Sequence, residues 1–127
     1  MPRTFIVLEK DDDLRSLYRR KLEQKFNSCV VMESASCAQA LEGLDRIPVD
    51  RVVANQAASD ARGVEMVQAI RQFDAEVLLI SICVAPQAEA SLRSGADSFI
   101  DTSDWERLGA AVERLLAGRR HRFQRGV

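Results

Sequence analysis

Five short apolar runs, separated by amphipathic segments, constrain the fold of this chain more than any other feature of its sequence. The runs are mostly β-branched or aromatic, and they lack the alternation of a half-buried strand. Strands covered on both faces have this composition, which is typical of a parallel sheet. The runs lie at 4–8, 29–32, 51–54, 77–82 and 98–100.

The segments between these runs predict helices, because their apolar residues recur at steps of three and four positions. A shorter segment, from Pro86 to Gly95, has a helix start signal and a helix stop signal. Ser103 is the expected cap of the last helix. Strands that alternate with helices predict an α/β fold with right-handed crossovers and an open, doubly wound sheet. Each predicted helix should bury one stripe of apolar side chains against the sheet. The expected stripes are Leu14, Leu17, Tyr18, Leu22 and Phe26; Ala40, Leu41, Leu44 and Ile47; Met66, Val67, Ile70 and Phe73; and Trp105, Leu108, Val112, Leu115 and Leu116.

The chain has 127 residues, which is enough for one domain with a substantial core. Its formal net charge of −1 argues against electrostatic binding of nucleic acid by the whole domain. Only the C-terminal stretch "GRRHRFQRG" is strongly basic. We therefore expect a domain over 1–118 and a basic tail or linker over 119–127, with nucleic-acid binding only through that tail.

The sequence indicates a cytoplasmic protein. No apolar run reaches the ~18 residues of a membrane span, and the N-terminus lacks the pattern of a secretion signal. Cys29, Cys37 and Cys83 share no metal-ligand spacing, so we expect reduced thiols. His121 is the only histidine, which removes most metal sites and any Ser-His or Cys-His nucleophile pair within the core.

In a doubly wound sheet, the functional crevice lies beyond the carboxyl ends of the strands. The residues to consider are therefore Glu9–Asp13, Asn55 and its successors, Ser81, and Asp101–Ser103. The first group lies in "FIVLEKDDDLR", where an acidic cluster directly after a buried strand suggests a magnesium site.

Four stretches resemble the receiver domain of two-component response regulators: "FIVLEKDDDLRSLYRRKLE", "VDRVVANQAASDARGVEMVQAIR", "VLLISI" and "SGADSFIDTSDW". The resemblance covers nearly the whole chain. It implies a flavodoxin-like fold with five helices around a five-stranded parallel sheet in the order 2-1-3-4-5. It also implies a phosphoryl group taken from a histidine kinase by an aspartate that ends the third strand, with Mg²⁺ held by that aspartate and an acidic pair.

The chain departs from the family at most of the positions that the resemblance assigns to this pocket. The acidic pair falls on Glu9 and Lys10, and the phosphoacceptor position falls on Asn55. The position of the family's lysine falls on Thr102, and the proline after it is Ser103. The resemblance therefore implies a degenerate form, a pseudo-receiver.

Two residues fit the family's switch pair of a hydroxyl and an aromatic side chain, namely Ser81 and Phe99. Without a phosphoryl group to bind, Ser81 can equally be a satisfied polar residue, and Phe99 can be core. The resemblance implies a contact surface on the fourth helix, fifth strand and fifth helix, around Arg93, Phe99 and Trp105. Its partner would be a signalling protein or an adjoining output domain, and a homodimer is a further option.

Elementary electrostatics oppose a metal in this pocket. Glu9, Lys10, Asn55 and Thr102 sum to zero charge. A charge pair at about 4 Å and an effective dielectric constant near 20 contributes about 4 kcal/mol. Replacing one carboxylate by an amide and another by a cation therefore removes several kcal/mol of attraction for Mg²⁺. We expect no cofactor, no metal and no enzymatic activity, and a function in phosphorylation-independent protein–protein contact.

Three alternatives remain at this point. Asp11 and Asp12 can form the acidic pair in a shifted register, with Asp60 as acceptor, although one of the pair can instead cap the helix that follows. Asp60 is more easily explained as a turn residue. The crevice can bind a small molecule, or the basic tail can bind DNA.

Overall fold

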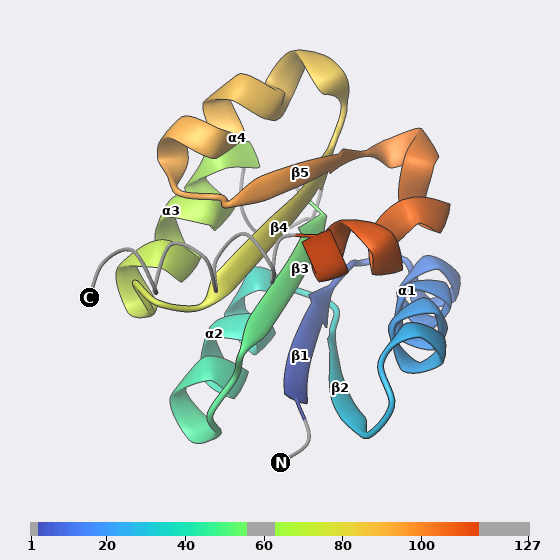
Figure 1. Cartoon of the computed structure of the whole chain (residues 1–127). Helices are drawn as coiled ribbons and strands as arrows, with labels where there is room; N and C mark the ends of the chain where they lie inside the picture. Colours follow the sequence, from blue (N-terminus) through green and yellow to red (C-terminus); the bar gives the residue numbers. More distant parts are fainter. Residues whose placement is uncertain (1–2, 56–62, 115–127) are drawn as a thin grey trace, which may run out of the picture.

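The computed structural model describes residues 3–55 and 63–114, which form a five-stranded parallel sheet between two layers of helices (Figure 1). The strand order is β2-β1-β3-β4-β5, which confirms the expected flavodoxin-like architecture. The strands are β1 (Arg3–Leu8), β2 (Cys29–Ser34), β3 (Arg51–Asn55), β4 (Leu78–Cys83) and β5 (Ser98–Asp101).

The helices begin and end at recognisable signals. The Asp11 carboxylate caps α1 by accepting from the backbone N–H of Leu14, and the Ser36 hydroxyl caps α2 by accepting from that of Gln39. The helices are α1 (Asp12–Lys25), α2 (Cys37–Arg46), α3 (Gly63–Phe73), α4 (Ala88–Ser94) and a last helical segment at 108–114. Two 3₁₀ helices, η1 (Ala85–Gln87) and η2 (Thr102–Arg107), precede α4 and the last segment.

Each face of the sheet has its own apolar core. The α2 and α3 side contains Ile6, Val52 and Leu79 with the expected stripe residues Met66, Val67 and Ile70. The α1 side contains Phe5, Val53 and Ile82 with Tyr18, Leu22, Leu108 and Val112. Because successive strand residues point to opposite faces, both faces of β3 and β4 are buried, as the unbroken apolar runs predict.

Two local expectations are wrong. Phe73 was placed in the buried stripe of α3, but it lies at the last position of that helix and is 48% exposed. Ser103 was expected to cap the last helix. Instead Asp101 accepts hydrogen bonds from both the backbone N–H and the hydroxyl of Ser103. A carboxylate one residue before the 3₁₀ turn can reach the N–H two positions on, so the cap lies earlier than the pattern predicts.

Arg71, in the last turn of α3, forms hydrogen bonds with the residues that follow α3, with the start of β4 and with the turn before β5. Its Nε donates to the carbonyl of Gly95 at 2.9 Å, and its Nη1 donates to the carbonyls of residues 74, 75 and 77. Its Nη2 pairs with Asp97 Oδ2 at 2.9 Å. The same carboxylate oxygen accepts from the backbone N–H of Leu79. Arg71 thus joins the start of β4 to the turn before β5.

The "GAD" motif at 95–97 is explained by this arrangement. Gly95 ends α4 with a φ of +126°, a conformation that side chains disfavour. A Cβ at this position would lie 2.9 Å from Arg71 Cγ. Asp97 is the carboxylate partner of the same arginine. The motif therefore accommodates one partly buried arginine.

Several sequence expectations fall partly or wholly outside the described residues: the boundary at 118, the tail 119–127, Asp60 and the Trp105 side chain. Cys29, Cys37 and Cys83 are free thiols. None of the described helices has the length and apolar character needed to cross a bilayer.

Candidate functional site

The carboxyl ends of β1 and β3 bring Glu9 and Asn55 together. Leu8 pairs in register with Ala54, so the residues that follow them lie side by side. The Asn55 Nδ2 donates to Glu9 Oε1 at 2.6 Å. Both side chains are buried, with Glu9 3% exposed and Asn55 8% exposed. An amide donor thus lies directly against the carboxylate.

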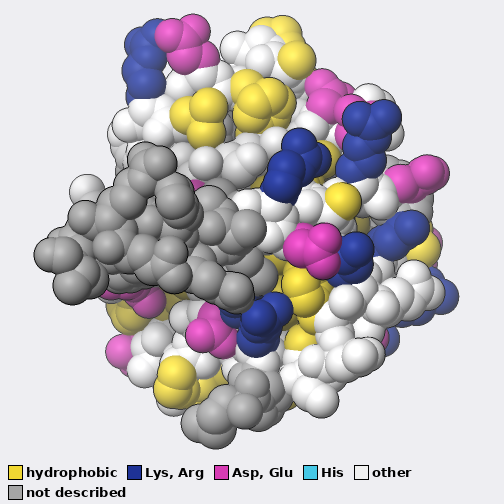
Figure 2. Space-filling model, viewed as in Figure 1, with side chains coloured by type: hydrophobic (Ala, Val, Ile, Leu, Met, Phe, Trp, Pro, Cys, Tyr) yellow, Lys and Arg dark blue, Asp and Glu magenta, His cyan; other side chains and the backbone are white. Residues whose placement is uncertain are grey.

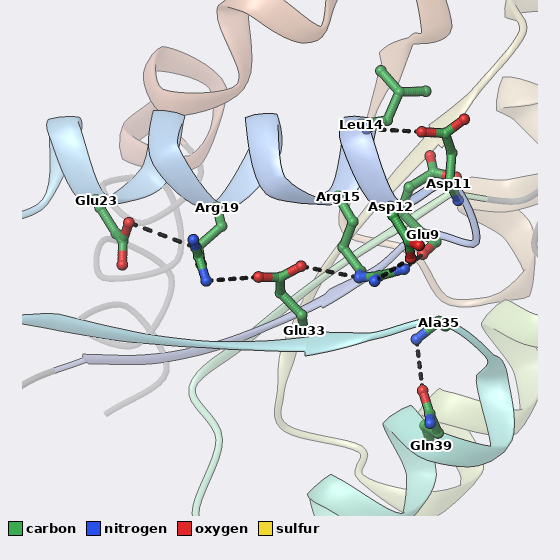
Figure 3. A network of polar contacts seen from close by, with 10 residues as sticks. All are labelled: Glu9, Asp11, Asp12, Leu14, Arg15, Arg19, Glu23, Glu33, Ala35 and Gln39. Carbon is green, nitrogen blue, oxygen red and sulfur yellow. Dashed lines mark hydrogen bonds and ion pairs between the residues drawn. The ribbon is translucent and has the colours of Figure 1, made fainter.

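Further hydrogen bonds fix Glu9 from three sides. Its Oε2 accepts from the backbone N–H of Asp11 at 3.1 Å. Its backbone N–H donates to the Ser34 carbonyl at 3.0 Å, and its own carbonyl accepts from Arg15 Nη1 at 2.8 Å. Figure 3 shows Arg15 reaching from α1 between Glu9, Asp12 and Glu33. The backbone and the side chain of Glu9 are therefore both held in place.

Tyr18, on α1, lies against the same pair and is 1% exposed. Burial raises the pKa of Tyr18 to about 12. The charge of Glu9 and a hydrogen bond to Glu9 act in the same direction, and a hydrogen bond with Asn55 acts against them. Since an unfolded tyrosine has a pKa near 10, this contribution to stability is complete below about pH 10 and is lost as the pH rises through about 12.

Asp11 and Asp12 have other partners. Asp11 is the N-cap of α1, with its Oδ1 3.0 Å from the backbone nitrogen of Leu14. Asp12 is exposed and pairs with Arg15 Nη2 at 2.5 Å. Lys10, between Glu9 and this pair, is exposed. The acidic run therefore contributes one buried carboxylate, that of Glu9.

The ends of β4 and β5 contribute the remaining predicted residues. Ser81 is fully buried and pairs in register with both Ala54 and Phe99. Thr102 is exposed at the start of η2. Phe99 is 37% exposed on β5, and Arg93 is exposed on α4, where it pairs with Glu89.

Sequence reasoning placed Asp101 at the functional edge of the sheet but did not identify its partners. Its Oδ2 accepts from the backbone N–H of Ala85 at 3.2 Å, so it joins the loop after β4 to the end of β5. Hydrogen bonds from the backbone N–H and the hydroxyl of Ser103 lower the pKa of Asp101, and the Ala85 N–H acts in the same direction. The signal for its placement was that Asp101 directly follows an apolar run.

The role of Asp11 can be tested by substitution. Asp11→Ala should lower the free energy of unfolding by about 1 kcal/mol, because the first turn of α1 loses its cap. Asp11→Asn should restore most of this loss, since an amide oxygen caps as well as a carboxylate. Urea denaturation with and without Mg²⁺ measures both changes. A loss in the asparagine variant that appears only with Mg²⁺ would instead identify Asp11 as a metal ligand.

Solved structures with the same fold cover nearly the whole chain, although no protein-family model and no curated protein matches the sequence. A LuxR-family two-component response regulator from Aurantimonas sp. SI85-9A1 is 24% identical with a TM-score of 0.82, over 93% of this chain and 87% of that one. The BeF3-activated DrrB receiver domain is 21% identical with a TM-score of 0.78, over 92% and 99%. NtrX from Brucella abortus is 18% identical with a TM-score of 0.86, over 99% of this chain and 30% of NtrX. Together with the sheet order, these similarities show that the chain has the fold of a response-regulator receiver domain.

Proposed function

We propose that this chain is a receiver-like domain of two-component signalling that is not phosphorylated at the end of β3 and acts by contact with other proteins. The observation that carries the proposal is the amide of Asn55, buried at the end of β3 and hydrogen-bonded to Glu9 at 2.6 Å. An acyl phosphate forms when a carboxylate oxygen attacks phosphorus. The neutral amide of Asn55 is not such a nucleophile.

The residues at this position do not fit Mg²⁺. This ion is usually held by one or two carboxylates together with phosphate oxygens. Here Glu9 is the buried carboxylate, both of its oxygens already accept hydrogen bonds, and Lys10 follows it. Within 3–55 and 63–114, no three His, Cys, Asp or Glu side chains are grouped as metal ligands. We therefore assign no metal and no phosphoryl-transfer step to this pocket.

Incubation with acetyl phosphate and Mg²⁺, followed by intact mass measurement, tests this proposal. The expected result is an unmodified chain under conditions in which a phosphorylatable receiver domain, run in parallel, gains one phosphoryl group. A stoichiometric adduct would contradict the proposal. Peptide mapping of the adduct would then distinguish Asp11, Asp12 and Asp60 as the acceptor.

The surface of α4 and β5 is the contact face that we propose. Leu92 and Phe99 are exposed large apolar residues on these two elements, and Val84 lies just before η1. Figure 2 shows apolar side chains over α4 and the turn before it. Arg93 places charge beside them. Aromatic and arginine side chains surrounded by apolar contacts are typical of protein interfaces.

The partner in this proposal is a signalling protein or an adjoining output domain. The region of NtrX that matches this chain is 30% of the NtrX chain, so most of NtrX lies outside the matching region. A receiver-like domain with an adjoining output domain would have this arrangement. A second copy of this chain is the other option. Sedimentation of the wild type and of Leu92→Ser/Phe99→Ser over a range of concentrations separates the two: self-association that the double variant loses identifies a homodimer, and a monomer at all concentrations excludes it.

A partner, and not a phosphoryl group, would control such a domain. A partner can shift a conformational equilibrium only by its difference in affinity for the two states. The contact between Asp101 and the Ala85 N–H joins the segment after β4 to the end of β5 without a phosphoryl group. The free thiols of the three cysteines support a cytoplasmic location.

A further inference from the structure

We propose that the Tyr18 hydroxyl is an internal ligand of Glu9 that takes the place of a divalent cation, so that exclusion of metal depends on Tyr18 as well as on Asn55. This inference rests on the proposed function and adds to it a residue that the family comparison does not single out. It is carried by the placement of three buried polar side chains on one face of the sheet. Tyr18 packs in the same cluster as Val7 and Val53, and Glu9 and Asn55 follow these two residues by two positions, so they point to the same face. Glu9 and Asn55 are joined by a hydrogen bond of 2.6 Å.

The position of Tyr18 follows from helix geometry. Helical side chains point back toward the N-terminus of their helix and cover the preceding turn. The N-terminus of α1 lies next to the carboxyl end of β1, since α1 begins at Asp12, four positions after Leu8. A long side chain in the second turn therefore extends toward Glu9. Leu14 and Leu22, in the same stripe, have no polar atom with which to reach it.

The chemistry of the cluster is that of a carboxylate surrounded by neutral donors. Glu9 Oε1 accepts from Asn55 Nδ2, and Oε2 accepts from the Asp11 backbone N–H. The hydrogen bond between Tyr18 and Glu9 adds a phenolic donor. A cation needs free lone pairs, and a carboxylate has about four lone-pair sites, of which these N–H and O–H groups occupy three. Mg²⁺ would have to displace donors that are already in place and buried.

Two variants that differ by one oxygen atom test this role. Lys10→Asp/Asn55→Asp supplies the carboxylates that the pocket lacks, and the same variant with Tyr18→Phe removes only the hydroxyl. Calorimetric titration with MgCl₂ should give about tenfold tighter binding without the hydroxyl, the effect of one hydrogen bond to a charged group. Equal affinities would overturn the role of Tyr18 and leave the proposed function intact. Stoichiometric Mg²⁺ binding by the wild type would instead overturn the proposed function.

A second measurement needs no engineered metal site. Tyr18 is the chain's only tyrosine, so tyrosinate absorbance reports on it alone. In the wild type it should titrate near pH 12, and in Glu9→Gln it should titrate at a lower pH, because the charge of Glu9 is gone. Circular dichroism at each pH confirms that both proteins remain folded. Identical titration curves in folded protein would show that Tyr18 and Glu9 do not interact, and would overturn the inference.

Discussion

Replacing Arg71 by alanine is expected to lower the free energy of unfolding by about 3 kcal/mol, since a mostly buried ion pair loses one partner. The Asp97 carboxylate would keep the N–H of Leu79 but lose its cation. The part-buried carbonyls of residues 74, 77 and 95 would lose a donor, as would the exposed carbonyl of residue 75. Urea denaturation, followed by circular dichroism, measures the change.

Arg93→Ala is the matched control, because Arg93 also pairs with a carboxylate but on the exposed surface of α4. That variant should change stability by less than about 1 kcal/mol. Arg71→Lys should recover only part of the loss, because an ammonium group cannot donate in the planar fork that reaches both Gly95 and Asp97. Equal losses of stability in Arg71→Ala and Arg93→Ala would show that burial of the Arg71 network does not contribute to the free energy of unfolding.

Asn55→Asp is expected to destabilise the protein by about 2 kcal/mol at neutral pH, because it sets a second carboxylate against Glu9 in a buried position. The Asn55 Nδ2 donor now lies 2.6 Å from Glu9 Oε1, and an aspartate oxygen at that place would repel it. The loss should shrink as the pH falls, since one proton shared by two carboxyl groups replaces the lost donor. Urea denaturation of both proteins at several pH values measures this dependence.

Asn27→Asp provides the comparison, because Asn27 is exposed in the turn between α1 and β2. The same chemical change there should alter stability by no more than about 0.5 kcal/mol and without a comparable pH dependence. If Asn55→Asp were as stable as the wild type at neutral pH, the pocket would already accept a second carboxylate. The arguments against a metal would then fail.

Most of the fold could be predicted from the sequence because it follows from where the apolar residues lie. Runs such as 51–54 and 77–82 have no polar face, so they must be strands inside a layered α/β fold. The pairing of Leu8 with Ala54 then places Glu9 beside Asn55. Phe73 was misplaced because periodicity does not indicate whether the last turn of a helix extends past the sheet.

The parts of the site that could not be predicted depend on side-chain reach. Tyr18 has the same place in the helical pattern as a leucine, and only its length and its hydroxyl bring it to Glu9. Asp101 and Ala85 are far apart in sequence, and their contact exists because β4 and β5 end side by side. Arg71 is similar, since nothing in its local sequence indicates five acceptors around it.

The contact between Asp101 and Ala85 has a consequence for how this domain responds to its surroundings. Both partners belong to one chain, so the fraction of molecules in which they are joined does not depend on the concentration of any ligand. A binding site loses its ligand when the concentration of that ligand in the cell falls, whereas an intramolecular contact does not depend on dilution. Because the pKa of Asp101 is lowered in the folded protein, acid weakens the contact only as the pH falls through that lowered pKa. At neutral pH Asp101 therefore remains an ionised acceptor for the Ala85 N–H, and a competing surface that offers its own donor to Asp101 would weaken this contact.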